Sequence, residues 1–146
     1  MNVTQRTFEV EAEPELTLAY LADFGNAEQW DPGTVRCVRS NAGPIEVGAT
    51  WHNTSRFAGR ETELEYRLDT LEPGHIVLVG ENKSATSTDD IRIVASPDSA
   101  GRSVVTYRSE VVFHGVAKVA GPFVQPEFER LGDKTVEGIS REVARL

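Results

Sequence analysis

The most sustained pattern of apolar and polar positions lies near the C-terminus and has the period of an α-helix. At about 100° per residue, apolar side chains from Val124 onward fall on one stripe, and charged side chains gather on the opposite side. Pro126 lacks a backbone N–H, so we expect the continuous helix to start near it, after a short kinked or separate turn. Gly132 and Gly138 flank the stripe and indicate close approach by a backbone or a bound molecule. The stripe consists of Val124, Phe128, Leu131, Thr135, Ile139 and Leu146.

The first thirty residues predict one strand followed by two short helices. Residues 2–11 alternate as a half-buried strand, although the alternation slips once. Pro14 suits the first position of a helix whose apolar face continues to about Ala22. A second, shorter helical turn is expected to end near Trp30. The apolar members of the strand are Val3, Phe8 and Val10.

Residues 34–113 have the character of strands throughout. Turn signals at 43–44, 48, 58–59, 73–74, 84–85 and 97–101 divide them into six runs at the spacing of hairpins. Together with the N-terminal strand and the C-terminal helix, these runs predict an α+β fold in which a seven-stranded antiparallel sheet packs against a long helix. A chain of 146 residues has the commonest size of a single domain, so we expect one domain, 1–146.

Hairpin loops determine which side chains share a face, because directly opposite residues on paired strands point the same way. A two-residue loop at Ala58-Gly59 pairs Phe57 with Arg60. Further along the hairpin, Trp51 then faces Tyr66, and Asn53 faces Leu64. Leu64, Tyr66 and Leu68 alternate with charged residues, so this set forms the inner, apolar face. We therefore expect Trp51 and Asn53 to point inward.

The same count continues across the turn at 73–74. It places Val79 opposite Leu68 and Glu81 opposite Tyr66. Val79 and a carboxylate, Glu81, are therefore expected on the inner face of the sheet.

The turn after Glu81 allows two interpretations. A three-residue loop at 84–86 turns two isoleucines inward and places Asp89 opposite Glu81. A two-residue loop instead turns Asp90 inward. We favour the first because it buries two isoleucines rather than two charges. The two inward sets are Asp89, Ile91 and Ile93 in the first case, and Thr88, Asp90 and Arg92 in the second.

The inner face obtained in this way is apolar with polar insertions. A sealed core would leave that many polar groups without partners, so we expect a cavity between the sheet and the C-terminal helix that holds water or a ligand. The candidate ligand-binding residues are Trp30, Trp51, Asn53, Tyr66, Leu68, Val79, Glu81, Ile91, Tyr107, Val124, Phe128, Leu131 and Thr135.

Four inner-face residues are candidates for catalysis. Glu81 and Asp89 are able to share a proton, so that one acts as general acid and the other as base. The hydroxyl groups of Tyr66 and Tyr107 are suited to polarise a carbonyl group. The structural alternatives are a carboxylate at the cavity mouth, in water or paired with a base, and tyrosines that only pack.

Charge and composition narrow the set of partners. A net charge of −8 argues against nucleic acid and anionic membranes. No apolar run approaches the roughly 18 residues that span a bilayer, and the N-terminus does not resemble a signal sequence, so we expect a cytoplasmic protein. Cys37 is the single cysteine, which excludes an internal disulfide and a cysteine-based metal site. Neither a metal nor a cofactor is expected, because His52, His75 and His114 are dispersed and are expected at the surface.

Short motifs along the whole chain carry a resemblance to a known superfamily. They are Ala12-Glu13-Pro14-Glu15, Asn26 to Trp30-Asp31-Pro32, Gly48 before Trp51, Leu71-Glu72-Pro73, and Gly101 leading into Val104-Val105-Thr106-Tyr107. In this order they resemble the START-like or helix-grip superfamily, which includes polyketide cyclases and dehydrases, lipid-transfer proteins and plant pathogenesis-related proteins. The resemblance implies a helix-grip fold, with a curved sheet wrapped around the C-terminal helix. No pattern identifies a branch of the superfamily, so no catalytic residue is carried over.

These observations lead to three functional hypotheses. The first is a binding protein that holds a hydrophobic or amphipathic small molecule in the cavity. The second is a cofactor-independent cyclase, dehydratase or isomerase acting on a polyketide-like or related hydrophobic substrate. The third is a protein-interaction module whose cavity is vestigial. Either a monomer or a homodimer is compatible with the sequence.

Overall fold

A single antiparallel sheet of seven strands forms most of the structure, a computed structural model that describes residues 1–57 and 59–146. The strands are β1 Asn2–Val10, β2 Thr34–Arg39, β3 Thr50–Phe57, β4 Arg60–Glu72, β5 His75–Glu81, β6 Ala85–Ala95 and β7 Ser103–Phe113. Their order in the sheet is β1-β7-β6-β5-β4-β3-β2. Consecutive strands from β2 to β7 are therefore neighbours, and β1 is added beside β7. The predicted sheet is confirmed.

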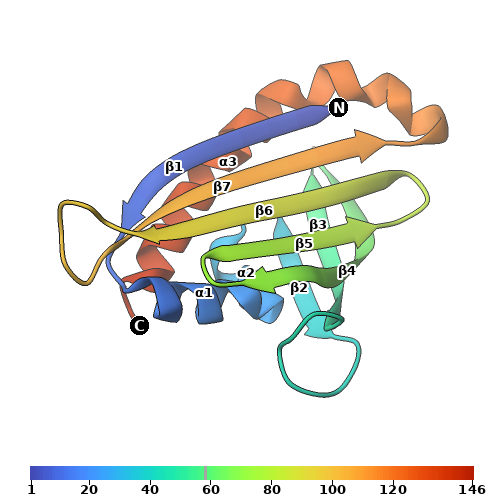
Figure 1. The fold of residues 1–146 in the computed structure, drawn as a ribbon. Helices are drawn as coiled ribbons and strands as arrows, with labels where there is room; N and C mark the ends of the chain where they lie inside the picture. Colours follow the sequence, from blue (N-terminus) through green and yellow to red (C-terminus); the bar gives the residue numbers. More distant parts are fainter. Residues whose placement is uncertain (58) are drawn as a thin grey trace.

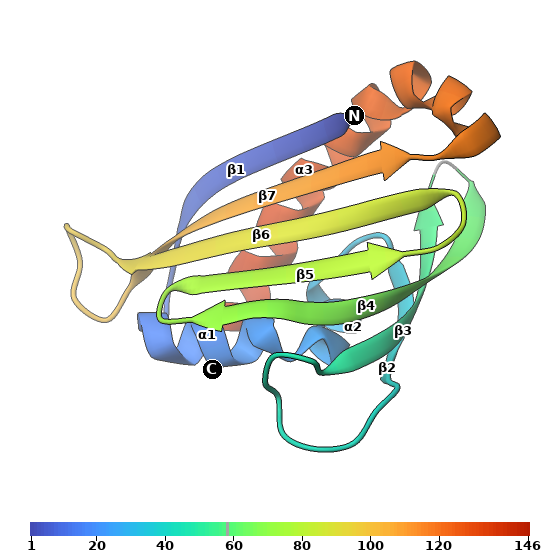
Figure 2. The same ribbon diagram turned by 45° about the vertical axis from the view of Figure 1, so that its right-hand side comes forward.

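One long helix crosses the concave face of this sheet. In Figures 1 and 2 the sheet lies in front and α3, Gly121–Val143, runs behind it, while the two short helices between β1 and β2 lie below. We call the side of the sheet that faces α3 the inner face. The shorter elements are α1 Pro14–Ala22, the 3-10 turn η1 Phe24–Asn26, α2 Ala27–Trp30, and the 3-10 turn η2 Gly115–Ala120 before α3. The helix-grip architecture expected from the sequence is present.

Helix α3 starts earlier than the sequence predicts. The expected start near Pro126 is wrong, because α3 begins at Gly121 and Pro126 lies inside it. Pro122 stands in the first turn, where the N–H it lacks would have no partner within the helix. The missing N–H of Pro126 removes only one further hydrogen bond, the one that would reach the carbonyl group of Pro122.

The apolar stripe of α3 is confirmed in its central part. Phe128, Thr135 and Ile139 are buried, and Val143 continues the buried face. Full burial of side chains such as Ile139 contributes roughly 1.5–3 kcal/mol each. Leu146 was wrongly placed on the stripe, since it lies beyond the end of α3 and is 54% exposed.

Both glycines of α3 mark close approach to other parts of the chain. A Cβ atom at Gly138 would collide with the backbone carbonyl oxygen of Trp30, at the end of α2. A Cβ at Gly132 would lie 2.6 Å from Oγ1 of Thr4 on β1. The predicted close approach is therefore made by the backbone of α2 at Gly138 and by a β1 side chain at Gly132.

The first strand has a different inner face from the one predicted. The pairing of β1 with β7 runs from Asn2 to Val10 without a register shift, so the predicted slip in alternation is wrong. Even-numbered residues point inward, and Val3 does not belong to the same face as Phe8 and Val10. The inward residues near the start of the strand are polar. The inner face was therefore predicted wrongly from the positions of the apolar residues.

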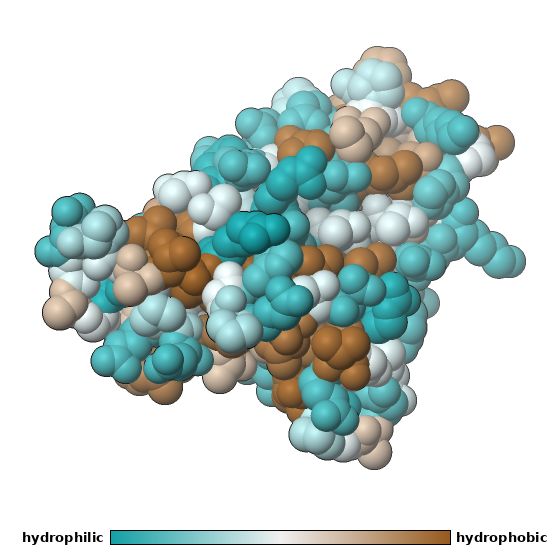
Figure 3. Space-filling view, in the orientation of Figure 1, coloured by the Kyte–Doolittle hydropathy of each residue, from teal (hydrophilic) through white to brown (hydrophobic). Residues whose placement is uncertain are grey.

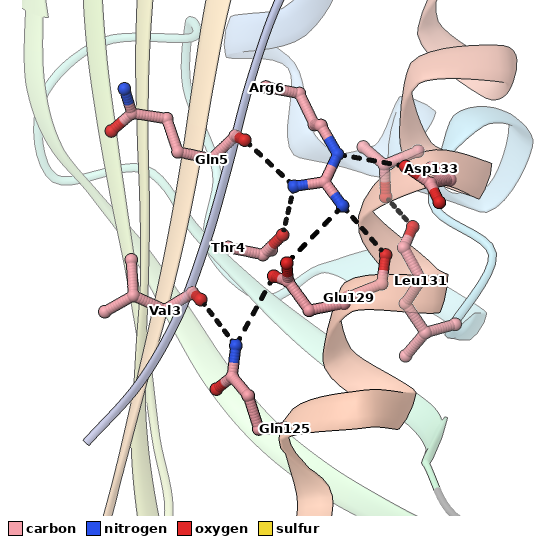
Figure 4. Close-up of polar contacts among 9 residues, drawn as sticks. Val3, Thr4, Gln5, Arg6, Gln125, Glu129, Leu131 and Asp133 are labelled. Atoms are coloured by element: carbon pink, nitrogen blue, oxygen red, sulfur yellow. Dashed lines mark hydrogen bonds and ion pairs between the residues drawn. The ribbon is translucent and has the colours of Figure 1, made fainter.

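Arg6 uses its inward position to attach β1 to α3 (Figure 4). Its Nε donates to Oδ1 of Asp133 at 3.0 Å, and Nη2 donates to the carbonyl oxygen of Glu129 at 3.1 Å. Nη1 donates to Oγ1 of Thr4 at 2.9 Å. One turn earlier, Gln125 donates from Nε2 to the carbonyl oxygen of Val3 at 2.9 Å. Charge-assisted hydrogen bonds such as those of Arg6 fix the position of the helix along the strand.

The hairpin of β3 and β4 has the predicted pairing. Trp51 lies opposite Tyr66, Asn53 opposite Leu64, and Phe57 opposite Arg60. Trp51 and Asn53 point inward and are each 1% exposed. The predicted two-residue loop includes Ala58, which lies outside the described residues.

The next hairpin contains a bulge that reverses the predicted faces of β5. The register of β4 with β5 shifts between Leu68 and Thr70. Leu68 therefore faces Leu78, and Glu65, an outward residue, faces Glu81. An extra residue in one strand moves every later side chain to the opposite face. The expected inward positions of Val79 and Glu81 are wrong, and Glu81 is exposed.

The turn between β5 and β6 lies two residues earlier than expected. Strand β5 ends at Glu81 and β6 begins at Ala85, so the connection is 82–84 rather than 84–86. Glu81 pairs with Thr86 and not with Asp89, so the predicted pair of carboxylates is wrong. The bulge in β4 and the earlier turn have opposite effects on which face of β6 points inward, so they cancel. The favoured inward set of Asp89, Ile91 and Ile93 is confirmed, each being at most 4% exposed.

The outer face of the sheet carries Asp90, the residue that the rejected alternative would have buried. It accepts a hydrogen bond from His75 Nε2 at 2.9 Å on that face. Figure 3 shows this side of the molecule as a mixture of hydrophilic side chains with scattered hydrophobic ones.

The inner face is divided between a packed core and an open region. At the end near α1 and α2, aromatic rings fill the space, with Phe24 and Tyr66 4.5 Å apart between ring centroids. Trp30 meets Tyr107 edge to face at 6.0 Å, and Phe24 meets Trp51 at 6.2 Å. Such packing leaves no room for a ligand at this end.

Candidate functional site

A cavity of about 600 Å³ occupies the other end, between the inner face of the sheet and the first half of α3. Its size lies within the range of sites for small organic molecules, roughly 300–1,000 Å³. Strands β3, β4, β6 and β7 supply one wall, while η2 and α3 supply the other. The start of β1 and the segment that joins α2 to β2 also contribute. This hollow lies between the sheet and the C-terminal helix, where the polar insertions predicted one, and its occupation by a ligand stays a prediction.

One flank of the cavity is apolar and partly aromatic. The rings of Phe57, at the end of β3, and Phe128, on α3, meet edge to face with centroids 6.2 Å apart. This pair brings the tip of the β3–β4 hairpin against the helix. The other apolar lining residues are Leu64, Ala85, Val111, Phe113, Ala117, Ala120, Val124 and Leu131.

A buried carboxyl group lies at the border between the cavity and the core. Asp89, on β6, is only 4% exposed, and its Oδ1 accepts a hydrogen bond of 3.0 Å from the hydroxyl of Tyr107. Ser109 lies directly opposite Asp89 on β7 and also faces the cavity. A carboxyl group in this position has little contact with water.

The surroundings of Asp89 raise its pKa from 3.8 to about 7. Burial is the largest cause, and the charge of Asp31 adds to it. The hydroxyl groups of Tyr107 and Ser109 act in the opposite direction, because they stabilise the carboxylate. Asp89 is therefore divided between its protonated and ionised forms near neutral pH.

The second carboxyl group that lines the cavity belongs to Asp31 and not, as predicted, to Glu81. Oδ1 of Asp31 accepts from the backbone N–H of Gly33 at 3.0 Å, and Oδ2 accepts from Oγ1 of Thr34 at 2.8 Å. These bonds hold the carboxyl group at the turn after α2, where it lines the cavity. Burial raises the pKa of Asp31 in spite of both hydrogen bonds.

Tyr66 and Tyr107 remain protonated hydrogen-bond donors. Burial raises the pKa of each well above 10, and the charge of Asp89 adds to this. Gly80 makes room for the ring of Tyr66, since a Cβ at this position would lie 2.5 Å from that ring. A side-chain hydrogen bond from Ser87 acts in the opposite direction and lowers the pKa of Tyr66.

The sequence-predicted site residues fall into three groups. Asp89 and six of the candidate ligand-binding residues line the cavity: Tyr66, Tyr107, Val124, Phe128, Leu131 and Thr135. Five others are buried in the packed part: Trp51, Asn53, Leu68 and Ile91 on the inner face of the sheet, and Trp30 on α2. Val79 and Glu81 face away from the cavity because of the β4 bulge. A role in ligand binding stays a prediction for the residues that line the cavity.

Asn53 illustrates why an inward polar residue need not meet a ligand. Its Nδ2 donates to Oγ1 of Thr34 at 3.2 Å, and its Oδ1 accepts from Oγ of Ser55. Both ends of the amide are thus hydrogen-bonded within the protein, and the residue is buried.

Several residues that line the cavity were not predicted from the sequence. Asn2 and Thr4 were passed over because the first strand was read by its apolar residues alone. Asp31 was treated only as part of a turn motif, although its place directly after the buried Trp30 was a usable signal. Phe57 already had a predicted pairing, Phe57 with Arg60, that puts it on the inner face.

The histidines and the cysteine do not form a metal centre. Within residues 1–57 and 59–146 there is no cluster of three metal-ligating side chains. His52 is on the surface between Glu63 and Glu65, and hydrogen bonds to these two carboxylates raise its pKa. His75 was expected at the surface, but its side chain is only 18% exposed beside Asp90. Burial raises the pKa of Cys37 to about 12, so its thiol is not an activated nucleophile.

The family model for polyketide cyclase / dehydrase and lipid transport matches residues 1–145, and the chain belongs to this family. Comparison with curated proteins finds no match. None of the described helices has the length and apolar character needed to cross a membrane.

Solved structures with the same fold come from several bacteria. The Zhui aromatase/cyclase from Streptomyces sp. R1128 has a TM-score of 0.79 at 16% identity, over 99% of this chain and 94% of that chain. A START superfamily protein from Mycobacterium smegmatis has a TM-score of 0.72 at 14% identity, over 99% and 96% of the two chains. A protein from Thermus thermophilus reaches 0.79 at 7% identity, over 98% and 97%. At these identities the likeness shows the fold.

Proposed function

We propose that this protein binds one hydrophobic or amphipathic small molecule in the cavity between the sheet and α3. The observation that carries the proposal is the division of the cavity into an apolar flank, around Phe57 and Phe128, and a polar end at Asp89 and Tyr107. A ligand with an apolar body and one polar group matches both parts. The family description, with cyclases and lipid transport, supports this class of ligand.

Binding is tested with N-phenyl-1-naphthylamine, an apolar fluorescent probe of suitable size. We expect saturable binding of one probe per chain, with a blue shift of its emission as it leaves water. Native mass spectrometry checks the stoichiometry, and chemical-shift changes in the amide spectrum should centre on Leu131 and Tyr107. Absence of saturable binding would overturn the proposal.

A second candidate is an enzyme of the cyclase or dehydratase kind, and the pKa of Asp89 favours it. A carboxyl group with a pKa of about 7 is suited to donate and accept protons at neutral pH. In a dehydration, Asp89 would give its proton to a leaving hydroxyl group, while Asp31 takes a proton from the neighbouring carbon. A C–O and a C–H bond then break, a C=C bond forms, and water leaves.

The enzymatic candidate makes a prediction that simple binding does not. Dehydration of a cyclic aromatic β-hydroxyketone, followed by the absorbance of the product, should require a protonatable group at position 89. Asp89→Asn should reduce the rate at least ~100-fold, the lower end of what a general acid contributes. Glu81→Gln, on the outer face, should leave the rate unchanged. Equal loss in both variants, or no loss in either, would argue against this mechanism.

A further inference from the structure

The residues that line the polar end of the cavity include acids but no base. Arg6, which lies opposite Tyr107 on β1, is already bound to Thr4, Glu129 and Asp133. Of the described residues that line the cavity, Asp31 and Asp89 are acidic and only Arg56 and Arg60 are basic. Arg56 is directed toward solvent and pairs with Glu61 at 3.2 Å. Leu68 on β4 lies at the same level of the sheet as Asp89, because Leu78 pairs with both residues. Arg60 is at the start of β4, eight residues from Leu68. At roughly 3.3 Å per residue, Arg60 is on the order of 25 Å along the sheet from that level.

The hydroxyl group of Tyr66 lies in the same region. Tyr66 is only 6% exposed and lines the cavity, and a side-chain hydrogen bond from Ser87, another lining residue, acts to lower its pKa. Its ring lies over Gly80, whose partner Ser87 is two residues from Asp89 on the same strand. A tyrosine oxygen that accepts one hydrogen bond from a serine has a second lone pair, with which it can accept a hydrogen bond from a ligand.

Two tyrosine rings lie beside Asp89. Tyr66 and Tyr107 both line the cavity beside Asp89, and the negative faces of such rings attract cations. An ammonium group has three N–H donors and no acceptor. It matches a carboxylate, the oxygen of a tyrosine hydroxyl and an aromatic face at the same time.

We propose that the buried end of the ligand is a protonated amine, held by Asp89 together with Tyr66 and Tyr107. This inference rests on the proposed function of the cavity and specifies the ligand class. The apolar body of the amine would lie against Phe57 and Phe128. The net charge of −8 further favours the approach of a cation.

Two other ligand classes fit this end less well. A carboxylate would be repelled by Asp31 and Asp89 in a region of low dielectric. A neutral carbonyl or hydroxyl would bind best when Asp89 is protonated, whereas an ammonium group binds best when Asp89 is ionised. The amine and the neutral ligand therefore have opposite dependences on pH. The titratable groups that face Asp89 are Asp31, Tyr66 and Tyr107, and the tyrosines stay protonated through neutral pH.

The experiment uses three probes with one naphthalene body: 1-naphthylmethylamine, 1-naphthylmethanol and 1-naphthoate. Isothermal titration calorimetry gives their Kd values at pH 6.0 and pH 8.0. We expect the amine to bind at least tenfold more tightly than the alcohol at pH 8.0, and 1-naphthoate to bind most weakly. The amine's affinity should increase from pH 6.0 to pH 8.0, whereas the alcohol's should not.

A pair of neighbouring variants locates the effect. Asp89→Asn should bring the ratio of amine to alcohol affinity close to one. Asp90→Asn, which changes the next residue on the outer face, should leave that ratio as in the unmodified protein. Circular dichroism establishes that both variants fold, and the pH comparison on the unmodified protein needs no variant.

The outcomes separate this inference from the function on which it rests. If the alcohol binds, and Leu131→Trp abolishes its binding, but the amine shows no preference or binds better at pH 6.0, only the amine is overturned. If none of the probes binds, the proposed function fails and the amine fails with it. If Asp89→Asn still binds the amine much more tightly than the alcohol, that result would also contradict the inference.

Discussion

The hydroxyl of Tyr107 donates a 3.0 Å hydrogen bond to Oδ1 of Asp89, at the border between the packed core and the cavity. Tyr107 is on β7 and Asp89 on β6, and neither side chain is more than 5% exposed. The bond therefore joins two neighbouring strands, β6 and β7, at the place where the packed core meets the cavity. It also adjusts the acidity of a carboxyl group whose pKa lies near neutrality.

Removing this hydrogen bond should make Asp89 a weaker acid. Tyr107→Phe takes away a donor that stabilises the carboxylate, so the pKa of Asp89 should rise above about 7, by roughly one pH unit. The measurement is an NMR titration of the Asp89 side-chain carboxyl carbon. Tyr66→Phe, which removes a hydroxyl without a hydrogen bond to Asp89, serves as the control. A pKa that is unchanged or lower in Tyr107→Phe would contradict this account.

The same carboxyl group should make the stability of the protein depend on pH. Its pKa is about 7 in the folded protein against an ordinary value of 3.8, so the folded state retains the proton where the unfolded state has lost it. The free energy of unfolding therefore falls as pH rises from about 4 to about 7. At about 1.4 kcal/mol per pKa unit, roughly 2–3 kcal/mol of this loss falls between pH 5 and pH 8.

Asp89→Asn removes that contribution. Urea unfolding at pH 5 and pH 8 should show a smaller decrease for Asp89→Asn than for the unmodified protein. Asp90→Asn should retain the larger decrease. If the unmodified protein and Asp89→Asn change in parallel, Asp89 does not hold a raised pKa.

Gly138 is expected to be intolerant of any side chain. A Cβ atom at this position would meet the backbone carbonyl of Trp30, and a backbone cannot move aside as the end of a side chain does. Gly138→Ala should lower the free energy of unfolding by about 2 kcal/mol or more, although alanine is the better helix former. Glu137→Ala, at the preceding position of the same helix, should change it by less than about 0.5 kcal/mol. Equal stability of the two variants would show that α2 and α3 are not in close contact.

Arg6 should contribute to the attachment of α3 to the sheet. Arg6→Met keeps most of the apolar stem but removes the hydrogen bonds to Asp133 and to the carbonyl of Glu129. Because the side chain is partly exposed, the expected loss is modest, about 1–2 kcal/mol in urea unfolding. Hydrogen exchange should increase in α3 near Glu129 more than in β4. Uniform exchange across the molecule would argue against a local attachment.

The sequence was informative where apolar and charged residues alternate strictly. Leu64 and Tyr66 alternate with glutamates, so the pairing of β3 with β4 was predicted residue by residue. No residue type marks the bulge after Leu68, and one extra residue was enough to move Glu81 to the wrong face. A count of strand faces is accurate only up to the first bulge.

The polar part of the site was harder to predict for a different reason. Asn2 and Arg6 face inward and bond to α3, and no local pattern encodes a partner more than a hundred residues away. Thr4, between them, accepts a hydrogen bond from Arg6. Asp31 reaches the cavity because Gly33 and Thr34 hold its carboxyl group in a turn. The apolar lining of α3, by contrast, follows from helical periodicity, which depends only on nearby residues.

The central claim is that the cavity beside α3 takes up a small apolar molecule, and Leu131→Trp tests it most directly. Leu131 lines the cavity, so a tryptophan at this position should fill part of the volume that a ligand needs. Val94→Trp, at a position that is 60% exposed and outside the cavity lining, is the matched control. Titration with N-phenyl-1-naphthylamine should show at least tenfold weaker binding to Leu131→Trp and unchanged binding to Val94→Trp. Equal affinity of the two folded variants would place the binding site elsewhere and contradict the account.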